Sequence, residues 1–140
     1  MVRISDIEII EMLMENARMP YVRIAEKLGV SEAAVRKRVK KLEEKGVILK
    51  YGIEVDIKKL GFEVLTIIGM DVEPQYFLKA IDSLKRMKEV IKLYTSSGDH
   101  MLLMECWFKS SEELNSFVRR LEKIEGTKRI CPAIIIERIK

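Results

Sequence analysis

Basic side chains gather in one short segment of this chain of 140 residues. Positions 31–45 carry six Lys and Arg against three Glu, although the formal net charge of the whole chain is only +4. Arg and Lys side chains on one helix face can contact phosphate oxygens and the edges of guanine bases. The segment therefore predicts a surface that binds nucleic acid, with a solvated basic helix face as the alternative interpretation.

Patterns of catalytic or metal-binding residues are missing from the sequence. It holds no glycine-rich phosphate loop, no nucleophile elbow and no signature of paired carboxylates. Cys106 and Cys131 form no CxxC pair, and with His100 they do not supply the closely spaced ligands of a structural zinc site. We therefore expect neither an enzyme nor a bound metal or cofactor.

The composition is that of a folded protein, with 48% hydrophobic and 34% charged residues. Its longest apolar runs, such as 133–136, are far shorter than the roughly 20 residues of a membrane-spanning helix. No basic stretch followed by an apolar core opens the chain, and two cysteines make no disulfide framework. These features favour a soluble, cytoplasmic protein that does not associate with membranes.

Three short helices are expected before residue 48. The first covers about 5–16, and the second about 21–28, directly after Pro20. Ser31 is placed to cap a third helix that ends at Gly46. The tight turn Gly29-Val30-Ser31 between the second and third helices predicts a helix-turn-helix, of the winged-helix-like kind.

The apolar stripe of the third helix decides which of its side chains face outward. Val35, Val39 and Leu42 recur at helical spacing and turn inward. The basic side chains and small residues then lie on the opposite face, where a helix can approach a DNA groove closely. Predicted contacts to bases or phosphates are Arg36, Lys37 and Lys40, with Ser31 and Ala33 beside them; predicted contacts to the DNA backbone are Arg38, Tyr21 and Arg23.

Residues 49–58 alternate between apolar and polar side chains, which predicts a half-buried linking strand. No adjacent strand is available to pair with it, and a lone strand leaves its backbone groups unpaired. It either pairs with a second subunit, the interpretation we favour, or forms a wing against a distant part of the chain. The expected organisation is a DNA-binding domain over 1–48, a linking strand and hinge over 49–61, and a second domain over 62–140.

The second domain is expected to have the element order βαββαβ. The strands are expected at 62–72, 89–96, 100–108 and 127–139, and the helices at 74–87 and from Ser110 or Ser111 onward. This order is the split arrangement of a ferredoxin-like domain, so the whole chain is expected to be an α+β protein.

The predicted strands are apolar on both faces, as in the runs 101–104 and 134–136 and at Leu65 and Ile67 of the first strand. Helices cover only one face of a ferredoxin-like sheet, whereas an antiparallel sheet normally keeps its other face polar. A second copy of the same sheet is the simplest cover. We therefore expect an isologous homodimer.

Taken together, these features resemble the Lrp/AsnC family of leucine-responsive, or feast/famine, transcription regulators. The resemblance rests on Asn16-Ala17-Arg18, Leu28-Gly29-Val30-Ser31, the runs 35–39 and 42–48, Leu60-Gly61 and Gly98-Asp99. It implies dimers, often assembled into tetramers or octamers, and an amino-acid effector bound between dimers in many members.

The resemblance assigns the effector contacts to Ser97, Gly98, Asp99 and His100. Gly98 and Asp99 match the family's Gly-Asp-Tyr-Asp loop, but Met101 stands where the second acidic residue belongs. Ile130 and Pro132 occupy the positions of two threonines in the last strand, and they offer no side-chain donor to a polar ligand. Three alternatives follow: a different effector, one whose charged groups are held elsewhere, or none.

The sequence thus predicts a sequence-specific regulator of transcription that binds double-stranded DNA, itself and an amino acid or related small effector. Two other functions remain open. One is a metabolite-sensing oligomer whose helix-turn-helix contacts protein. The other is an architectural DNA-coating protein, whose binding would depend steeply on salt and little on sequence.

Overall fold

The computed structural model describes residues 5–140. The chain divides between Val55 and Asp56 into two compact units, each described by itself below. Within the described residues, no helix is both long and apolar enough to cross a membrane.

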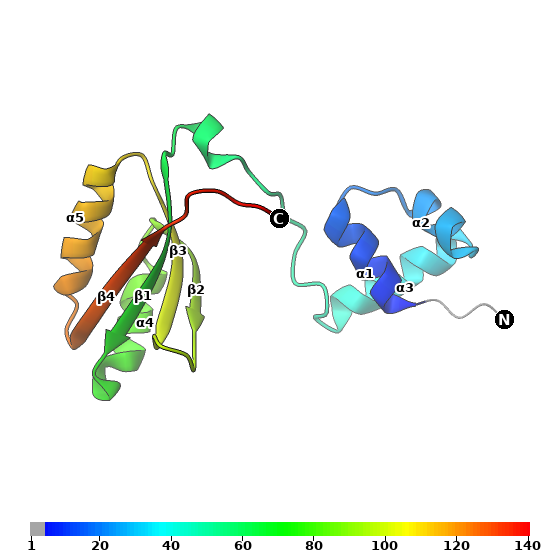
Figure 1. The fold of residues 1–140 in the computed structure, drawn as a ribbon. Helices are drawn as coiled ribbons and strands as arrows, with labels where there is room; N and C mark the ends of the chain where they lie inside the picture. The colour runs from blue at the N-terminus through cyan, green and yellow to red at the C-terminus, as the bar shows by residue number, and fades with distance from the viewer. Residues whose placement is uncertain (1–4) are drawn as a thin grey trace. The chain divides into compact units, whose positions relative to one another are not determined.

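The N-terminal unit is built from three helices, as the sequence predicts (Figure 1). They are α1 (Asp6–Glu15), α2 (Tyr21–Leu28) and α3 (Glu32–Glu44). Their apolar faces meet in a core of Ile9, Leu13, Met19, Ile24, Ala25, Val35, Val39 and Leu42. The side chains of Ser5 and Ser31 accept hydrogen bonds from the backbone N–H groups of Glu8 and Ala34, which caps α1 and α3.

The turn between α2 and α3 depends on Gly29. Its φ of 65° is the left-handed conformation that ends a helix and that glycine adopts without steric cost. The N–H of Val30 then donates to the carbonyl of Ala25 at 3.1 Å, which closes the turn. This local geometry fixes where α3 begins relative to α2.

The linking strand predicted over residues 49–58 is not formed in the single chain. Residues 49–56 have no regular structure, and the 3-10 helix η1 (Ile57–Leu60) follows them. Leu49 and Ile53 expose 89% and 88% of their surface. The physical reason is that a strand needs a neighbour for its backbone hydrogen bonds, and no other strand within residues 5–140 supplies one. Pairing with a second subunit stays a prediction.

The C-terminal unit has the predicted order of strands and helices (Figure 1). Its elements are β1 (Val64–Val72), η2 (Pro74–Tyr76), α4 (Phe77–Lys85), β2 (Val90–Thr95), β3 (Leu102–Phe108), α5 (Ser111–Glu122) and β4 (Thr127–Ile134). The sheet order is β2-β3-β1-β4, and all neighbouring strands are antiparallel. This is the ferredoxin-like arrangement.

All four strands are shorter than the sequence predicts, β1 and β2 by two residues each. β3 begins at Leu102 and not at His100, because the N–H of Met101 donates to the carboxylate of Asp71 at 2.9 Å instead of joining the sheet. The carbonyl of Met101 accepts from the N–H of Ser96, which closes the loop between β2 and β3. β4 ends at Ile134 and not at Ile139. Its partner β1 begins close to the residue that pairs with Ile134, so few residues of β1 are left to pair with 135–139.

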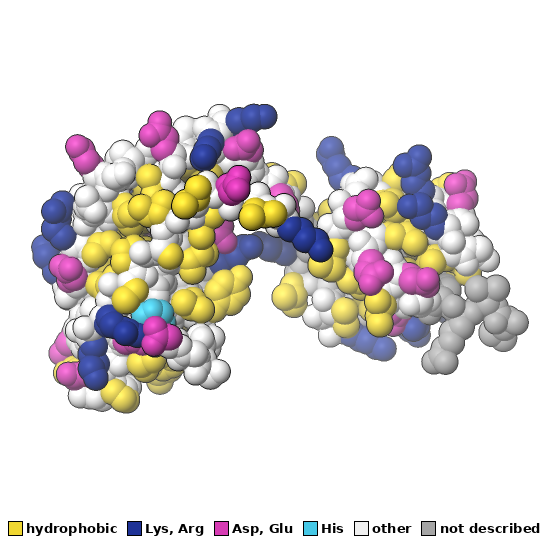
Figure 2. Space-filling model, viewed as in Figure 1, with side chains coloured by type: hydrophobic (Ala, Val, Ile, Leu, Met, Phe, Trp, Pro, Cys, Tyr) yellow, Lys and Arg dark blue, Asp and Glu magenta, His cyan; other side chains and the backbone are white. Residues whose placement is uncertain are grey.

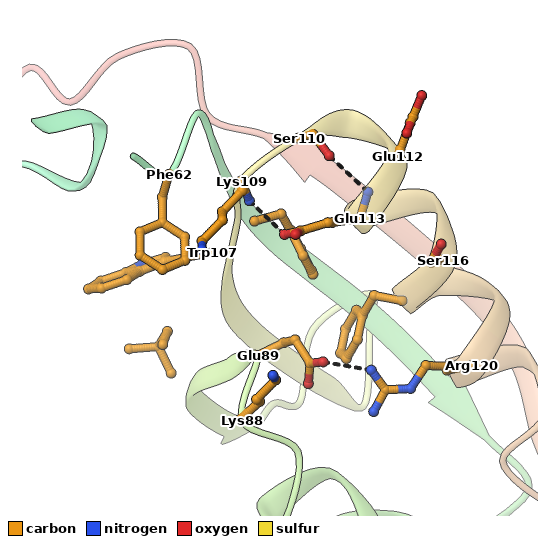
Figure 3. Close-up of a pocket in the computed structure, with 13 residues that line it drawn as sticks. Phe62, Lys88, Glu89, Trp107, Lys109, Ser110, Glu112, Glu113, Ser116 and Arg120 are labelled. Carbon is orange, nitrogen blue, oxygen red and sulfur yellow. Dashed lines mark hydrogen bonds and ion pairs between the residues drawn. The ribbon is translucent and has the colours of Figure 1, made fainter. Parts of the chain in front are cut away.

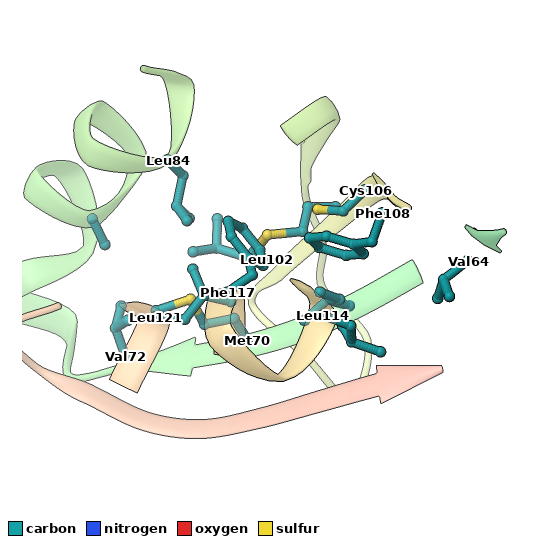
Figure 4. Close-up of a cluster of buried hydrophobic side chains, with 13 residues drawn as sticks. Val64, Met70, Val72, Leu84, Leu102, Cys106, Phe108, Leu114, Phe117 and Leu121 are labelled. Atoms are coloured by element: carbon teal, nitrogen blue, oxygen red, sulfur yellow. The ribbon is translucent and has the colours of Figure 1, made fainter. Parts of the chain in front are cut away.

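The two faces of this sheet differ in what covers them. Helices α4 and α5 cover one face, and Figure 4 shows Leu84, Phe117 and Leu121 directed at side chains of β1 and β3. Cys106 lies in this core and is fully buried. Burial of Cys106, followed by the negative charges of Glu89 and Glu105, raises the pKa of its thiol to about 12.

No helix among the described residues packs on the opposite side of the sheet, called here the helix-free face. Because side chains alternate along a strand, this face carries Leu65, Ile67, Leu103, Trp107 and Cys131. All five are partly exposed in the single chain. Figure 2 shows hydrophobic side chains spread across this side of the sheet. The helix-free face thus carries the apolar side chains that the sequence predicts there, together with Asp71, Glu105 and Arg129.

Candidate nucleic-acid interface and ligand loop

The structure presents most of the predicted DNA contacts to solvent. Arg23, Ser31, Ala33, Arg36, Lys37 and Lys40 are exposed, and Tyr21 is half-buried. The core residues Val35, Val39 and Leu42 hold the opposite face of α3. The basic face of α3 is thus free to approach a groove of DNA.

Arg36 is held in a defined position on this face. Its guanidinium carbon lies 5.3 Å from the centre of the Tyr21 ring, a cation–π contact between α3 and α2. Its Nη2 also pairs with the Glu32 carboxylate at 2.7 Å, one turn earlier in α3. Because 64% of the Arg36 side chain is exposed, the group is oriented but still accessible. A phosphate or base would have to compete with Glu32 for it.

Tyr51 belongs to the linking strand that the sequence predicts, but the structure places it beside the helices of the N-terminal unit, in contact with Tyr21. Burial raises the pKa of Tyr51, and the negative charge of Glu43 and a hydrogen bond with Tyr21 add to the effect. The segment after α3 therefore returns to the same part of the N-terminal unit that holds Arg36. No sequence spacing signals this contact, because 30 positions separate the two tyrosines.

Arg38 does not share the exposed face of α3. It turns toward α1, where both oxygens of the Asp6 carboxylate accept hydrogen bonds from its guanidinium. The pair spans 32 positions of sequence and ties the start of α1 to the middle of α3. A contact of Arg38 with phosphate stays a prediction that would require this pair to open.

We expect Arg38→Ala to lower the stability of the N-terminal unit by up to about 1 kcal/mol, because the pair is partly exposed and partly screened. Thermal unfolding followed by circular dichroism measures this loss. If the pair with Asp6 stays closed on DNA, the folded variant keeps its DNA affinity, measured by fluorescence anisotropy. A large loss of affinity at unchanged stability would instead favour the phosphate contact.

A polar cluster surrounds the loop between β2 and β3 that holds Ser97, Gly98, Asp99 and His100. His100 Nδ1 donates to Asp71 Oδ2 at 2.9 Å, and Arg129 Nε donates to the same oxygen at 3.1 Å. Arg129 Nη2 also pairs with Asp99 Oδ1 at 3.2 Å. Asp99 is 81% exposed and Arg129 49% exposed, so two opposite charges stand side by side at the surface.

The structure thus adds Asp71 and Arg129 to the residues that the sequence singled out. Asp71 lies in β1 and Arg129 in β4, and both are far from the loop in sequence. Gly98 donates its N–H to Ser96 Oγ, which shapes the turn, while Ser97 takes part in none of the hydrogen bonds described for the cluster. His100 itself lies directly over Gly69 of β1.

The cluster keeps the Asp71 carboxyl ionised. Burial is the largest single influence and acts to raise its pKa, but hydrogen bonds from the Met101 N–H, His100 and Arg129 outweigh it. The pKa of Asp71 therefore lies below its usual value. Among residues 5–140, no three His, Cys, Asp or Glu side chains are grouped so as to hold a metal ion.

The pKa of Asp71 is lower in the folded chain than in the unfolded chain, where it is about 3.9. The ionised carboxylate therefore stabilises the fold at pH values above about 3.9, and this stabilisation is lost as the pH falls through the folded pKa. We expect Asp71→Asn to be less stable than the wild type at neutral pH. The difference should shrink at acidic pH, where both chains carry a neutral group. Urea unfolding at several pH values measures it, and a difference that does not vary with pH would contradict the expectation.

Two family models match the chain, one on each unit. Residues 3–48 match a winged helix-turn-helix DNA-binding model, and residues 65–140 match the Lrp/AsnC ligand-binding domain. The chain is 46% identical over 133 residues to the HTH-type transcriptional regulator LrpA of Pyrococcus horikoshii, with 94% of each chain covered. It is 35% identical over 133 residues to LrpA1 of Halobacterium salinarum, again with 94% of each covered.

Solved structures show the same likeness. AsnC of E. coli is 25% identical and superposes with a TM-score of 0.83, covering 99% of this chain and 95% of that one. A transcriptional regulator of Neisseria meningitidis in complex with L-Met has a TM-score of 0.88 over 99% and 93% of the two chains. At 20% identity, that second likeness concerns the fold alone. The chain belongs to the Lrp/AsnC family of HTH-type transcription regulators, with an N-terminal DNA-binding domain and a C-terminal ligand-binding domain.

Proposed function

We propose that this regulator places α3 in the major groove of specific DNA sites, with Arg36, Lys37 and Lys40 contacting bases or phosphates. The observation that carries the proposal is the exposed basic face of α3, on which Arg36 is oriented by Tyr21. Ala33 and Ser31 at the start of the helix allow a close approach to the groove. Tyr21 and Arg23 are proposed to contact the DNA backbone.

The helix-free face of the C-terminal unit supports a homodimer. Leu65, Ile67, Leu103 and Trp107 give this face an apolar character that a second copy of the same face would bury. A two-fold axis would then present two copies of α3 to half-sites about one turn of DNA, or a multiple of it, apart. We also propose further association into tetramers or octamers, and this part of the proposal rests on the resemblance to the family.

Ile67→Asp is expected to break this dimer, because it would bury an unpaired carboxylate against the partner. Such a charge costs about 3 kcal/mol or more, or about a hundredfold in the dissociation constant. Sedimentation equilibrium measures the mass at several concentrations. Leu78→Asp is the matched control, since Leu78 lies on α4 and is 75% exposed. A variant Ile67→Asp that stays fully dimeric would place the interface elsewhere.

We further propose an amino-acid effector at the loop formed by Ser97, Gly98, Asp99 and His100. Asp99 and Arg129 together offer one negative and one positive group to a zwitterion. Asp71 accepts hydrogen bonds from the Met101 N–H and from Arg129, which holds the loop in shape although Met101 lacks the family's second acidic side chain. The L-Met complex of the Neisseria regulator supports an amino acid as the class of ligand.

DNase footprinting on the DNA upstream of the regulator's own gene tests the proposed function. It is run at near-physiological salt, with and without a mixture of amino acids. Protected half-sites spaced by whole helical turns are expected, with a change in protection when the amino acids are added. Protection without boundaries would favour a DNA-coating protein, whose affinity falls steeply with salt. No protection above competitor DNA would favour a sensor that does not act on DNA.

A further inference from the structure

Glu32 is an acidic side chain on the surface that is proposed to bind DNA. It is the first residue of α3, directly after the capping residue Ser31, and it is the only Asp or Glu between positions 31 and 42. Its side chain is 45% exposed. A recognition helix contacts base edges mainly with its N-terminal residues, so Glu32 lies within reach of bases when α3 enters a groove. The contacts predicted from the sequence include its neighbours Ser31 and Ala33 but not Glu32 itself.

In the free protein Glu32 pairs with Arg36. Oε1 of Glu32 accepts a hydrogen bond from Arg36 Nη2 at 2.7 Å, one turn later in α3. An exposed pair of this kind contributes little to stability, so it can open on DNA at little cost to the fold. The contact of Arg36 with the Tyr21 ring is separate, with 5.3 Å between the guanidinium carbon and the ring centre. Arg36 therefore stays oriented when its pair with Glu32 opens.

A guanine bound by Arg36 changes the surroundings of Glu32. Arginine commonly donates to O6 and N7 of guanine, and the guanine competes with Glu32 for the guanidinium. The Glu32 carboxylate then lies in the groove, close to phosphates of the same charge. A carboxylate that loses its partner there costs free energy unless another donor replaces the one it lost.

The major groove offers such a donor at two of the four bases. Cytosine presents its N4 amino group alone, whereas adenine presents its N6 amino group beside the acceptor N7. Guanine and thymine present acceptors, and thymine also a methyl group. Because N7 of adenine repels an approaching carboxylate oxygen, cytosine is the base that fits Glu32.

The spacing of the two side chains limits where this cytosine can lie. Glu32 and Arg36 are one i,i+4 step apart, which is about 6 Å along the helix axis. Successive base pairs of DNA are about 3.4 Å apart. The base bound by Glu32 therefore lies within two base-pair steps of the base bound by Arg36.

We propose that Glu32 determines base specificity, and that its carboxylate accepts a hydrogen bond from the N4 amino group of a cytosine near the guanine that binds Arg36. This inference rests on the proposed function, because it requires α3 to lie in the major groove. It assigns a guanine and a nearby cytosine to each half-site. The alternative is that Glu32 only stabilises the start of α3 through the helix dipole, in which case no base preference depends on it.

Selection from a random DNA library tests the inference. The full-length wild type and the variants Glu32→Ala and Glu32→Gln are each used at near-physiological salt, and the bound DNA is sequenced. The wild type is expected to enrich half-sites with a guanine and a nearby cytosine. Glu32→Ala is expected to keep the guanine and to lose about fivefold or more of the preference for cytosine. Glu32→Gln is expected to prefer adenine at that position, because a glutamine amide pairs with N6 and N7 of adenine.

A modified base tests the hydrogen bond itself. N4-methylcytosine still pairs with guanine, but its methyl group replaces the amino hydrogen that points into the major groove. Placed at the selected cytosine, it is expected to weaken binding of the wild type about fivefold or more and to leave binding of Glu32→Ala unchanged. Fluorescence anisotropy measures both affinities. Equal losses for the two proteins would contradict the hydrogen bond.

Glu44→Gln is the matched control. Glu44 is exposed at the last position of α3, so the substitution removes the same charge from the opposite end of the helix. Its affinity for all DNA should rise slightly, as that of Glu32→Gln does, because each variant loses a negative charge. The half-sites that Glu44→Gln enriches should match those of the wild type.

The outcomes separate this inference from the proposed function. If Glu32→Ala enriches the same half-sites as the wild type, the inference is wrong and the proposed function stands. If Glu32→Ala loses the guanine together with the cytosine, the inference is also wrong, because Glu32 then acts only by holding Arg36. A wild type that enriches no sequence would reject both the inference and sequence-specific binding.

Discussion

Arg36→Ala is expected to weaken binding to a specific DNA site by about 1–3 kcal/mol, if Arg36 contacts a base edge. The structure orients the guanidinium by its contact with the Tyr21 ring, so little side-chain entropy is lost when it meets the groove. Fluorescence anisotropy with the footprinted site and with a scrambled site of the same length measures the effect. The loss should be large on the specific site and small on the scrambled one.

Two further variants make this result interpretable. Arg36→Lys keeps the charge but loses the planar fork, so it should recover nonspecific binding and not the preference for the specific site. Lys41→Ala removes a neighbouring exposed charge of α3 outside the predicted contacts and should change both affinities only slightly. Equal losses on both DNAs would make Arg36 a phosphate contact, and no loss on either would remove it from the interface.

Gly69→Ala is expected to lower the free energy of unfolding by about 1–3 kcal/mol, the usual cost of adding an atom to a packed site. A Cβ at this position would lie 2.3 Å from Cδ2 of the His100 ring. The ring cannot move away freely, because its Nδ1 is bonded to Asp71. Urea unfolding followed by circular dichroism measures the change in stability.

Gly52→Ala is the matched control for this substitution. A Cβ at Gly52 would meet no atom within 4 Å, so the variant should be as stable as the wild type or slightly more stable. Removing the ring in the double variant Gly69→Ala, His100→Ala should recover part of the loss, as expected for residues in contact. A Gly69→Ala variant as stable as the wild type would show that the ring does not press on β1.

The N-terminal helices could be predicted closely because their signals are local. Ser31 and Gly29 lie within a few positions of the helix ends that they determine, and α2 begins and ends at the predicted residues. The arrangement of the C-terminal strands in the sheet could also be predicted, because few topologies fit elements that follow one another along the chain as βαββαβ. The linking strand predicted over 49–58 is not formed in the single chain for the opposite reason. Its alternation is real, but a strand forms only where a partner is present.

The details of the sites could not be read from the sequence, because they join distant residues. Arg129 and Asp71 are 58 positions apart, and Asp71 and His100 are 29 apart. Helix periodicity predicted a contact of Arg38 with the DNA backbone but could not show that Asp6 binds it. The hydrogen bond from Arg120 of α5 to Glu89, which precedes β2, likewise joins residues 31 positions apart, and no spacing rule reports it. Both residues line the pocket shown in Figure 3.

The core position of Cys106 means that oxidation and alkylation of the native protein should reach only one thiol. A buried thiol with a pKa of about 12 has almost no thiolate at neutral pH, and thiolate is the reactive form. Cys131 lies on the helix-free face and is partly exposed. Its rate of alkylation should therefore fall as subunits associate, so the chain carries a chemical reporter of its own assembly.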